Sequence, residues 1–429
     1  MGYFVLLLTI VVYLIRPAEW IPALYFNWNM LLNILGILVM LGVALNQNRK
    51  FTYDRTTLFL LWFIFAMILS NLFNGQFNTI SGYISQILST LIIFVLTQTA
   101  ITRPKQIDNF ILVIILVVLF ICFQCYLQAT VGYNWGGLEP FTRGLVSQSG
   151  VEEAAREIQV VWYGVLQDPN DLGMLLIAFM PYIFSRVFYQ KIDFIKKCFW
   201  IIAMLIIGYT VILTNSRGSM LSLIGGLAFF YIIKKRSMTG YVLASIAGLA
   251  LLAIAPSRMA ELGSGDYSAM GRVYAWILAL ELLAMNPIFG IGAKHFLDYH
   301  ALTTHNSYVL AMVENGIIGF IGYFSIFAIT VFTTVKVAYT VEDKRRSIEI
   351  IALVSGMVGI LISIFFISRT YALLPFLYVA IVMTYLRVHT PELFNEYISK
   401  LKLFKLVVLS GFFIIGLYIF NRLATAILI

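Results

Sequence analysis

Residues 110–120 read FILVIILVVLF, an uninterrupted run of large apolar side chains. A second run, Trp200–Leu213, reads WIIAMLIIGYTVIL, and a third extends from Gly316 to Val335. Runs of this kind need hydrocarbon around them, and about 20 helical residues make one membrane crossing. The three runs therefore predict an all-α, polytopic integral membrane protein.

The composition of the whole chain points to the same class. Of its 429 residues, 61% are hydrophobic and 11% are charged, whereas roughly 25% are charged in a soluble domain. The formal net charge of +9 does not indicate a nucleic-acid partner, because basic loops are the usual mark of the cytoplasmic face of a membrane protein.

Apolar runs between charged loops predict about 12–13 transmembrane helices in one domain, residues 1–429. The first run, Tyr3–Ile15, is interpreted as a retained helix, because it lacks the basic start and the small-residue cleavage site of a signal peptide. The thirteen predicted spans are 3–15, 29–45, 58–73, 79–98, 109–131, 171–189, 198–214, 219–233, 239–255, 316–335, 347–367, 372–386 and 406–428.

The basic residues divide into two groups. Twenty lie in loops that alternate correctly with the predicted spans, so their face is predicted to be cytoplasmic. Nine lie on the outer face, and eight of these are arginine. Arginine grips phosphate or carboxylate at two points, which the point charge of lysine cannot do. The bias predicts anion binding at the outer face, with pairing to outer glutamates or snorkelling to lipid headgroups as the alternative.

Two long loops are predicted on the outer, periplasmic face. Residues 132–170 carry Gly, Pro and acidic residues, with a short helix predicted around residues 152–161. Residues 256–315 contain apolar side chains at helical spacing from Gly271 to Met285, which predicts an amphipathic helix at the outer surface.

Arg217 lies in the turn NSRGS, residues 215–219, between two apolar helices. The next helix begins beside it, so free backbone N–H groups and a positive dipole end face whatever Arg217 binds. Arg272, at the start of the predicted amphipathic helix, is expected to reach the same cavity, and Arg369 lies in another outer turn. The alternatives are capping and snorkelling for Arg217, and pairing with loop carboxylates for Arg272.

Of the four histidines, His305 is the best candidate for proton transfer, since an ordinary pKa near 6.5 suits a base at neutral pH. His295, His300 and His305 are five residues apart, a spacing unlike that of zinc ligands on one helix, so no metal site is predicted. The alternative is an ordinary boundary histidine. The predicted catalytic residues are His305, Arg217 and Arg272; the predicted substrate-binding residues are Asn306, Arg369, Asn215, Asp168, Asn170 and Glu314. Asn170 or Asp171 is expected to cap a helix.

Arginines that grip phosphate, together with a base on the outside of a membrane, fit few reactions. The chain has no P-loop, so the donor must arrive already activated and anchored to a lipid. A polyprenyl-diphosphate sugar meets both demands. The arginines would neutralise the leaving diphosphate in place of a metal ion or other cofactor, and direct attack by the acceptor hydroxyl would invert the anomeric centre.

Four patterns in order resemble the bacterial O-antigen ligase and O-antigen polymerase superfamily, most closely the ligases. They cover residues 168–319, while the first third of the chain matches in hydropathy alone. The first three patterns are Asp168-Pro169-Asn170, the turn at residues 215–219, and the segment GRVYAW at 271–276 with NPIFGIG at 286–292. The fourth is His305-Asn306, then nine intervening residues, Gly316, two further residues and Gly319.

The resemblance implies a GT-C-like fold in the bacterial inner membrane, with the site facing the periplasm. It implies an undecaprenyl-diphosphate-linked glycan donor, metal-independent transfer, and Arg217, Arg272 and His305 in the site. A lipid A-core acceptor makes a ligase, another lipid-linked repeat a polymerase, and a protein an O-oligosaccharyltransferase. RPAEWIP at residues 16–22 is not typical of lipopolysaccharide ligases, which keeps the last two alternatives open. A transporter of lipid-linked glycan is disfavoured, because the unusual charges gather at the outer boundary rather than at the midplane.

Overall fold

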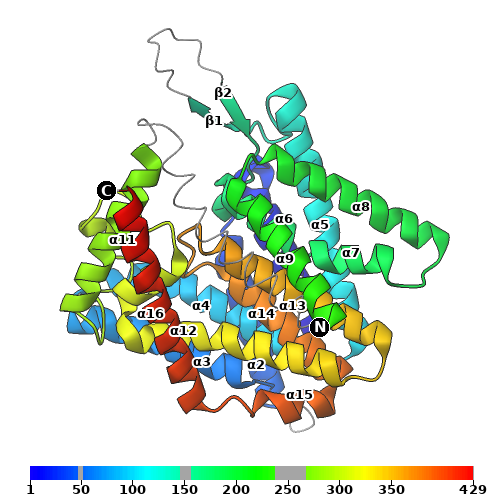
Figure 1. Ribbon diagram of the computed structural model, residues 1–429. Helices are drawn as coiled ribbons and strands as arrows, with labels where there is room; N and C mark the ends of the chain where they lie inside the picture. Colours follow the sequence, from blue (N-terminus) through cyan, green and yellow to red (C-terminus); the bar gives the residue numbers. More distant parts are fainter. Residues whose placement is uncertain (47–51, 145–155, 237–266, 429) are drawn as a thin grey trace.

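The computed structural model describes residues 1–46, 52–144, 156–236 and 267–428. These residues form a bundle of helices from which one short hairpin projects (Figure 1). The prediction of an all-α membrane protein is confirmed. Its GT-C-like arrangement and the division into loops stay predictions.

In the described ranges, the secondary structure is helical apart from the two-stranded sheet of β1 and β2. The first half comprises α1 (Gly2–Ile15), the 3-10 helices η1 (Pro17–Glu19) and η2 (Pro22–Leu24), α2 (Trp28–Ala44), α3 (Arg55–Phe73), α4 (Phe77–Ala100), α5 (Pro104–Val131), β1 (Phe141–Gly144), β2 (Arg156–Gln159), η3 (Gly164–Leu166), α6 (Pro169–Ala178) and α7 (Met180–Phe188). The second half comprises α8 (Phe194–Leu213), α9 (Arg217–Lys235), α11 (Tyr267–Met285), η4 (Phe296–Asp298), α12 (Ser307–Thr340), α13 (Lys344–Ser363), α14 (Leu373–His389), α15 (Pro391–Ile398) and α16 (Leu403–Leu428).

Within the described ranges, nine helices are long and apolar enough to cross a membrane. Shorter apolar helices lie at Trp28–Ala44, Gln86–Ala100 and Leu373–His389. Together these correspond to twelve of the thirteen predicted spans. The remaining one, 239–255, lies outside the described residues.

The span predicted at 171–189 is present as Pro169–Phe188, but it is broken into α6 and α7 at Phe179, because Pro181 has no N–H with which to continue the helical hydrogen bonds. One prediction of local structure was wrong. The helix predicted around residues 152–161 is not formed at its described end, where β2 instead pairs antiparallel with β1. Pairing with a strand distant in sequence satisfies the backbone there, a contact that local periodicity does not reveal.

Helix α12 begins nine residues earlier than the predicted span. Gly316, taken as the first residue of that span, is instead a break inside the helix, with φ of 64° and ψ of −172°. This conformation is almost exclusive to glycine. The polar residues just before it, Glu314 and Asn315, are buried in the protein, so low hydropathy there did not mean a loop.

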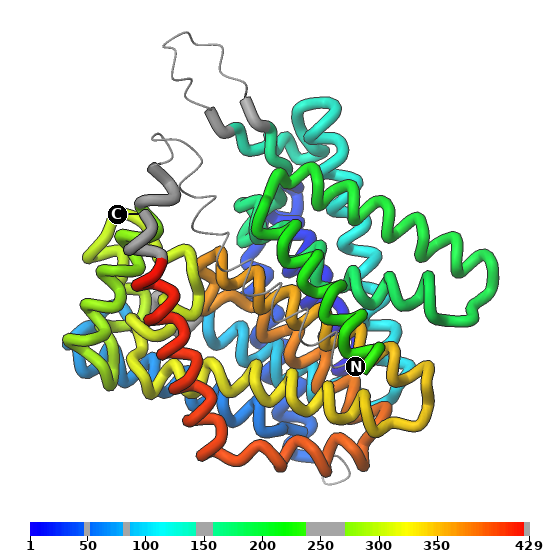
Figure 2. Tube along the Cα trace, viewed as in Figure 1, coloured from blue at the N-terminus to red at the C-terminus, as the bar shows by residue number. Residues whose placement is uncertain are grey.

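The helices differ in how far they face the membrane. The α6–α7 span, Pro169–Phe188, is 83% buried inside the protein, whereas Leu403–Leu423 of α16 is only 17% buried. Helix α12 packs against α3, α13 and α14 in the interior. Figure 2 shows α16 crossing the bundle next to α12, and it also contacts α11. The large apolar side chains on its free face are therefore directed at lipid.

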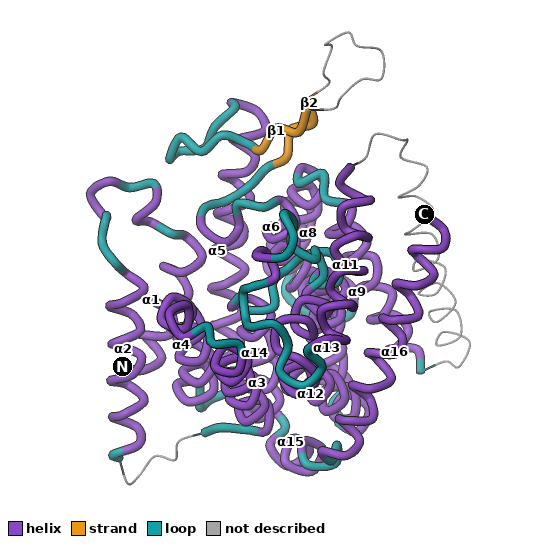
Figure 3. The backbone as a smooth tube through the Cα atoms, turned by 90° about the vertical axis from the view of Figure 1, so that its left-hand side faces the viewer, coloured by secondary structure: helices purple, strands orange, loops and turns teal. Residues whose placement is uncertain are grey.

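The hairpin and α15 mark two opposite ends of the bundle (Figure 3). In Figure 3 the β1–β2 hairpin lies above the helices and α15 lies below them. We call these the hairpin end and the α15 end. The starts of α6, α9 and α12 are joined to the hairpin by hydrogen bonds. The start of α5, the start of α13 and the end of α7 are joined in the same way to the end of α14, which α15 follows.

Candidate functional site

The predicted site residues come from four segments that the fold joins at the hairpin end. Ser216, before α9, donates its hydroxyl to Asn170 Oδ1 at the start of α6 (2.6 Å). Ser307, at the start of α12, donates its hydroxyl to the carbonyl of Ile367 (2.6 Å) and accepts the N–H of Arg369 (2.8 Å). The pairing of Arg369 with Asp171, 198 residues apart in sequence, links these two pairs of segments into one hydrogen-bonded framework.

The start of α12 holds His305 in an unusual backbone conformation. Asn306 caps the helix, since its side-chain oxygen accepts the N–H groups of Tyr308 (3.0 Å) and Val309 (3.2 Å). His305, one residue earlier, has φ of 47°, a left-handed conformation that is uncommon for a residue other than glycine. The turn therefore sets the direction of the imidazole.

Arg272 reaches this turn from α11. The indole N–H of Trp276 donates to the carbonyl of Thr304 (2.5 Å) and so ties α11 to the residue just before His305. Arg272 lies four residues before Trp276, one helical turn away on the same face. The packing of α11 therefore brings the positive charge of Arg272 close enough to act on His305, and the predicted shared cavity of Arg272 and Arg217 stays a prediction.

The surroundings of His305 depress its pKa to about 4. Burial is the largest cause, the positive charges of Arg272 and Arg369 act in the same direction, and the carboxylate of Asp168 opposes them. The imidazole is thus neutral at physiological pH and able to accept a proton. The same balance shows that charges from α6, α11 and the segment after α13 all act on this histidine.

Arg369 is held by a carboxylate that the sequence analysis assigned to another role. Its Nε donates to Asp171 Oδ1 (2.6 Å), and its Nη2 pairs with Asp171 Oδ2. The predicted cap of α6 was Asn170 or Asp171, and this was wrong: Asp168 caps the helix by accepting the N–H of Asn170 (2.8 Å). Asp171 does not cap α6, and its carboxylate instead holds the guanidinium of Arg369.

Arg217 is the first residue of α9, and its side chain is exposed. Capping of α9 falls to Ser216, whose hydroxyl accepts the N–H of Ser219 (3.1 Å). No residue in the described parts of the chain forms a hydrogen bond or ion pair with Arg217. A positive side chain at a helix N-terminus, where the backbone N–H groups also point outward, is suited to an anion from solution or lipid.

A cavity of about 890 Å³ opens beside these segments. Four of the predicted substrate-binding residues line it, namely Asp168, Asn170, Glu314 and Arg369. His305, Arg217 and Arg272 are not among its lining residues, although Thr303, two residues before His305, is. The three predicted catalytic residues therefore lie outside the lining of this cavity.

Glu314 is deeply buried and engaged on all sides. Its carboxylate accepts the N–H of Phe296 (3.2 Å) and the hydroxyl of Tyr371 (2.7 Å). Its carbonyl accepts the hydroxyl of Ser70 (2.6 Å) and the N–H of Gly292 (3.1 Å). These bonds join the loop before η4 to the cavity wall, and substrate contact by Glu314 stays a prediction.

Gly316, the first glycine of the motif that begins at His305, is the residue at which α12 is broken. Backbone groups freed by the break are paired with the segment NPIFGIG: Ile317 N–H donates to Pro287 (2.9 Å) and Ile291 N–H donates to Val313 (3.0 Å). A Cβ on Gly316 would lie 2.2 Å from the carbonyl oxygen of Ile288. Irregular backbone is tolerated at membrane depth only when protein groups satisfy it in this way.

Two other predicted residues have structural contacts. Asn215 donates its side-chain N–H to the carbonyl of Ile158 (2.9 Å) and so holds the hairpin. Asn306 is buried beneath the turn that it caps. Substrate contact by either residue stays a prediction.

The remaining histidines have local partners. His295 Nδ1 lies 2.5 Å from Asp298 Oδ2, and His300 Nδ1 lies 3.0 Å from the N–H of Leu302. In the parts of the chain that the structure describes, no group of three or more His, Cys, Asp or Glu residues is placed to hold a metal ion. Metal independence stays a prediction.

Lys294 and Tyr371 are among the cavity-lining residues that were not predicted from the sequence. Lys294 lines the cavity with φ of 64°, and burial lowers its pKa, although Glu314 opposes this. Tyr371 lines it beside Glu314. In the sequence, Lys294 differs from the other eight basic residues predicted on the outer face only in being a lysine.

Comparison with known proteins agrees with the motifs. Residues 202–324 match the family model described as O-antigen ligase. The matched segment extends from α8 into α12 and contains Arg217, Arg272 and His305, so the resemblance to the O-antigen ligase and polymerase superfamily is confirmed. A search of curated proteins gave no significant match.

Proposed function

From its O-antigen ligase domain and its many apolar helices, we propose that this membrane protein is a glycosyltransferase acting at the hairpin end. The donor is a glycan on undecaprenyl diphosphate, and the acceptor is a hydroxyl of lipid A-core. His305 is the general base, and Arg217 and Arg272 bind the diphosphate. The observation that carries the proposal is a neutral histidine under the influence of Arg272 and Arg369, beside a cavity of about 890 Å³.

In the proposed reaction, a ring nitrogen of His305 removes the proton of the acceptor hydroxyl. The oxygen attacks the anomeric carbon as the bond from that carbon to the diphosphate oxygen breaks. The guanidinium groups neutralise the charge that grows on the leaving diphosphate. One direct displacement leaves the product with inverted configuration, and no cofactor takes part.

The low pKa of His305 fits a base that is switched on by the donor. Arg272 and Arg369 help to hold the imidazole neutral in the free protein. A bound diphosphate would offset these positive charges, and the imidazole would then become a stronger base. Base strength would thus rise only when the leaving group is in place.

The proposed location is the bacterial inner membrane, with the hairpin end in the periplasm. The basic residues predicted on the outer face are almost all arginine and include Arg217, Arg272 and Arg369 of the proposed site, whereas those predicted on the other face are mostly lysine. An excess of lysine and arginine on short loops marks the cytoplasmic side.

A polymerase or a protein O-oligosaccharyltransferase would use the same donor and the same base, and would differ in the acceptor. The test must therefore identify the acceptor as well as the chemistry. We would delete the gene and complement the strain with wild type, His305→Ala or the matched control His300→Ala, which alters another histidine of the same loop.

For a ligase, deletion and His305→Ala should leave full-length glycan on undecaprenyl diphosphate and bare lipid A-core, and His300→Ala should restore transfer. Single repeats on core would instead identify a polymerase, and loss of glycan from a protein would identify the third activity. Normal glycan on every acceptor in the deletion strain would refute the proposal.

A further inference from the structure

A second pocket lies at the α15 end, far from the proposed site. Its volume is about 370 Å³, and it is lined by residues of α5, α7, the α7–α8 loop, α8 and α13. Arg345 lines it at the start of α13, whereas Ser363 at the other end of that helix lies near the proposed site. Eighteen residues of helix separate the two by about 27 Å.

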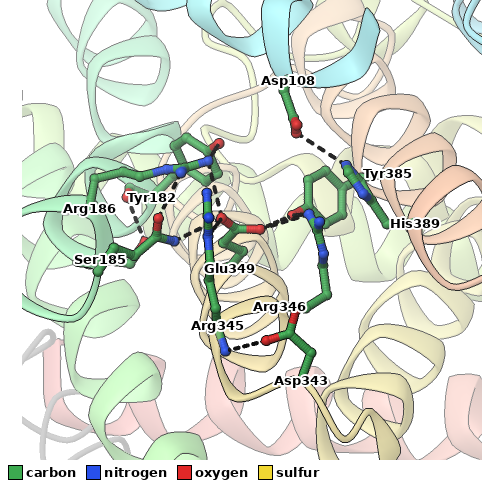
Figure 4. Close-up of polar contacts among 11 residues, drawn as sticks. Asp108, Tyr182, Ser185, Arg186, Asp343, Arg345, Arg346, Glu349, Tyr385 and His389 are labelled. Atoms are coloured by element: carbon green, nitrogen blue, oxygen red, sulfur yellow. Dashed lines mark hydrogen bonds and ion pairs between the residues drawn. The ribbon is translucent and has the colours of Figure 1, made fainter. Parts of the chain in front are cut away.

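A buried ion-pair network forms one side of this pocket (Figure 4). Glu349 of α13 is 1% exposed at its side chain and receives three arginines: Arg186 (3.2 Å), Arg345 (3.4 Å) and Arg346 (2.8 Å). Gln190 also donates to it (2.8 Å). One carboxylate therefore faces three guanidinium groups, and the network carries an excess of positive charge.

The lining of the pocket is also positive in balance. Its basic residues are Arg186, Lys191, Lys196 and Arg345, and its acidic residues are Asp108 and Asp193. Both carboxylates have other partners, because Asp193 pairs with Lys196 (2.6 Å) and Asp108 lies 3.1 Å from His389 Nε2. Lys191 has no carboxylate partner among the described residues, and Arg345 shares Glu349 with two other arginines, so the pocket keeps a net positive charge.

The excess of positive charge extends into the protein interior at Arg186. It lies on α7, and its side chain is only 12% exposed. Its Nε is buried and has no hydrogen-bond partner among the described residues, even though the other two nitrogens bond Gln190 and Tyr182. Glu349 is already its carboxylate partner (3.2 Å), and the Nε is one further buried donor that a second anion would satisfy.

The other lining residues place the pocket at the level of lipid headgroups. Trp200 and Tyr182 contact each other edge to face, with ring centroids 6.4 Å apart, and such aromatic residues gather where headgroups meet hydrocarbon. Leu112 of α5 lines the pocket nearby. Leu116, one turn further along α5, and Leu205 on α8 are exposed apolar side chains that continue toward the middle of the membrane.

We propose that this pocket binds the phosphate headgroup of an anionic phospholipid, whose acyl chains lie along α5 and α8. The basic lining neutralises the phosphodiester, and the aromatic pair covers the glycerol region. Basic pockets between membrane helices are known to suit such headgroups. The proposal does not depend on the glycosyltransferase activity, because it concerns the opposite end of the bundle.

The test measures lipid binding by the delipidated full-length protein in detergent. We would titrate dioctanoyl phosphatidylglycerol and follow the midpoint of thermal unfolding, with dioctanoyl phosphatidylcholine and inorganic phosphate as comparison ligands. The pocket variant is Lys191→Gln/Arg345→Gln, since both side chains are largely exposed and their loss should leave the fold intact. The matched control is Lys105→Gln/Lys197→Gln, which removes the same charge at the same end but outside the pocket lining.

Phosphatidylglycerol should stabilise wild type and control alike, and the pocket variant should bind it roughly 10- to 30-fold more weakly. Equal weakening in both variants, or none in either, would show a diffuse charge effect and overturn the proposal. Equal stabilisation by phosphatidylcholine would remove the need for an anionic headgroup. Equal stabilisation by inorganic phosphate would replace the lipid with a free anion.

Discussion

Both ends of the bundle place arginines beside a pocket, but they hold these arginines and their neighbours on different kinds of backbone. At the hairpin end the key residues lie in turns, and His305, Asn215 and Lys294 have φ of 47°, 47° and 64°. At the α15 end Arg186 and Arg346 lie within regular helices. Unfavourable backbone persists only where the surrounding structure enforces it, and it gathers at functional sites. The contrast favours chemistry at the hairpin end and a passive, electrostatic role at the other.

The ends also differ in how their charges are used. Arg217 is exposed, and no described residue pairs with it, while Arg369 has one carboxylate partner. At the α15 end, three arginines converge on Glu349. An arginine that must release and rebind a diphosphate cannot be tied down by a network of this kind.

The largest effect on the rate of transfer is expected at His305, which lies at the hairpin end. Replacing it with alanine should lower transfer by roughly 10²–10⁴-fold, because the acceptor hydroxyl loses its base. The measurement is turnover of purified protein on lipid-linked donor, together with donor binding. A folded His305→Ala protein that binds donor and transfers glycan at the wild-type rate would return His305 to an ordinary boundary residue.

Arg217→Lys and Arg272→Lys should each lower kcat/KM by roughly 10- to 100-fold, the cost of losing one charge-assisted hydrogen bond from a two-point grip. Arg345→Lys at the α15 end makes the same chemical change far from the proposed site and should leave turnover near wild type. Comparable losses in all three variants would mean that the two ends do not differ in the way proposed.

The stability of the break in α12 gives a smaller effect. Gly316→Ala should reduce the free energy of unfolding by about 1–3 kcal/mol, because alanine does not tolerate this backbone conformation, and the clash with Ile288 adds to the loss. Gly411→Ala, on α16, is the control, since a Cβ there would meet nothing within 4 Å. Thermal unfolding in detergent measures both, and equal midpoints would mean that the break is not required for the fold.

The pH dependence should sharpen the assignment of His305. Its pKa is about 4 in the folded protein and near 6.5 when unfolded, so between these values the unfolded chain binds the extra proton. Folding stability should therefore fall as pH drops from about 6.5 to 4 and then level off, and His305→Ala should flatten that decline. The profile of kcat/KM should hold to lower pH than that of kcat, because bound diphosphate raises the pKa.

The smallest expected effect is that of chelation. Transfer should be unchanged by EDTA, since the arginines take the place of a cation at the leaving group. Turnover before and after chelation, with a divalent ion added back, is the measurement. A loss that the ion restores would reinstate a metal-dependent mechanism.

Much of this protein was determined by its sequence alone. Hydrocarbon around a helix selects apolar residues over about 20 positions, so local composition was sufficient to predict the twelve spans found in the described residues. Apart from α12, the predicted spans begin within about five residues of the observed helices, because the change from polar to apolar residues is local in the chain. The motif residues Arg217, Arg272 and His305 were predicted from spacing and residue type.

Only the tertiary structure decided how these parts meet. The bond of Arg369 to Asp171 spans 198 residues, and the break at Gly316 is satisfied by a loop that ends more than twenty residues earlier. Hydropathy also marked Glu314 as a loop residue, although α12 buries it. The physical reason is that a buried polar group is stable when its hydrogen bonds are made, and the partners that make them come from other helices.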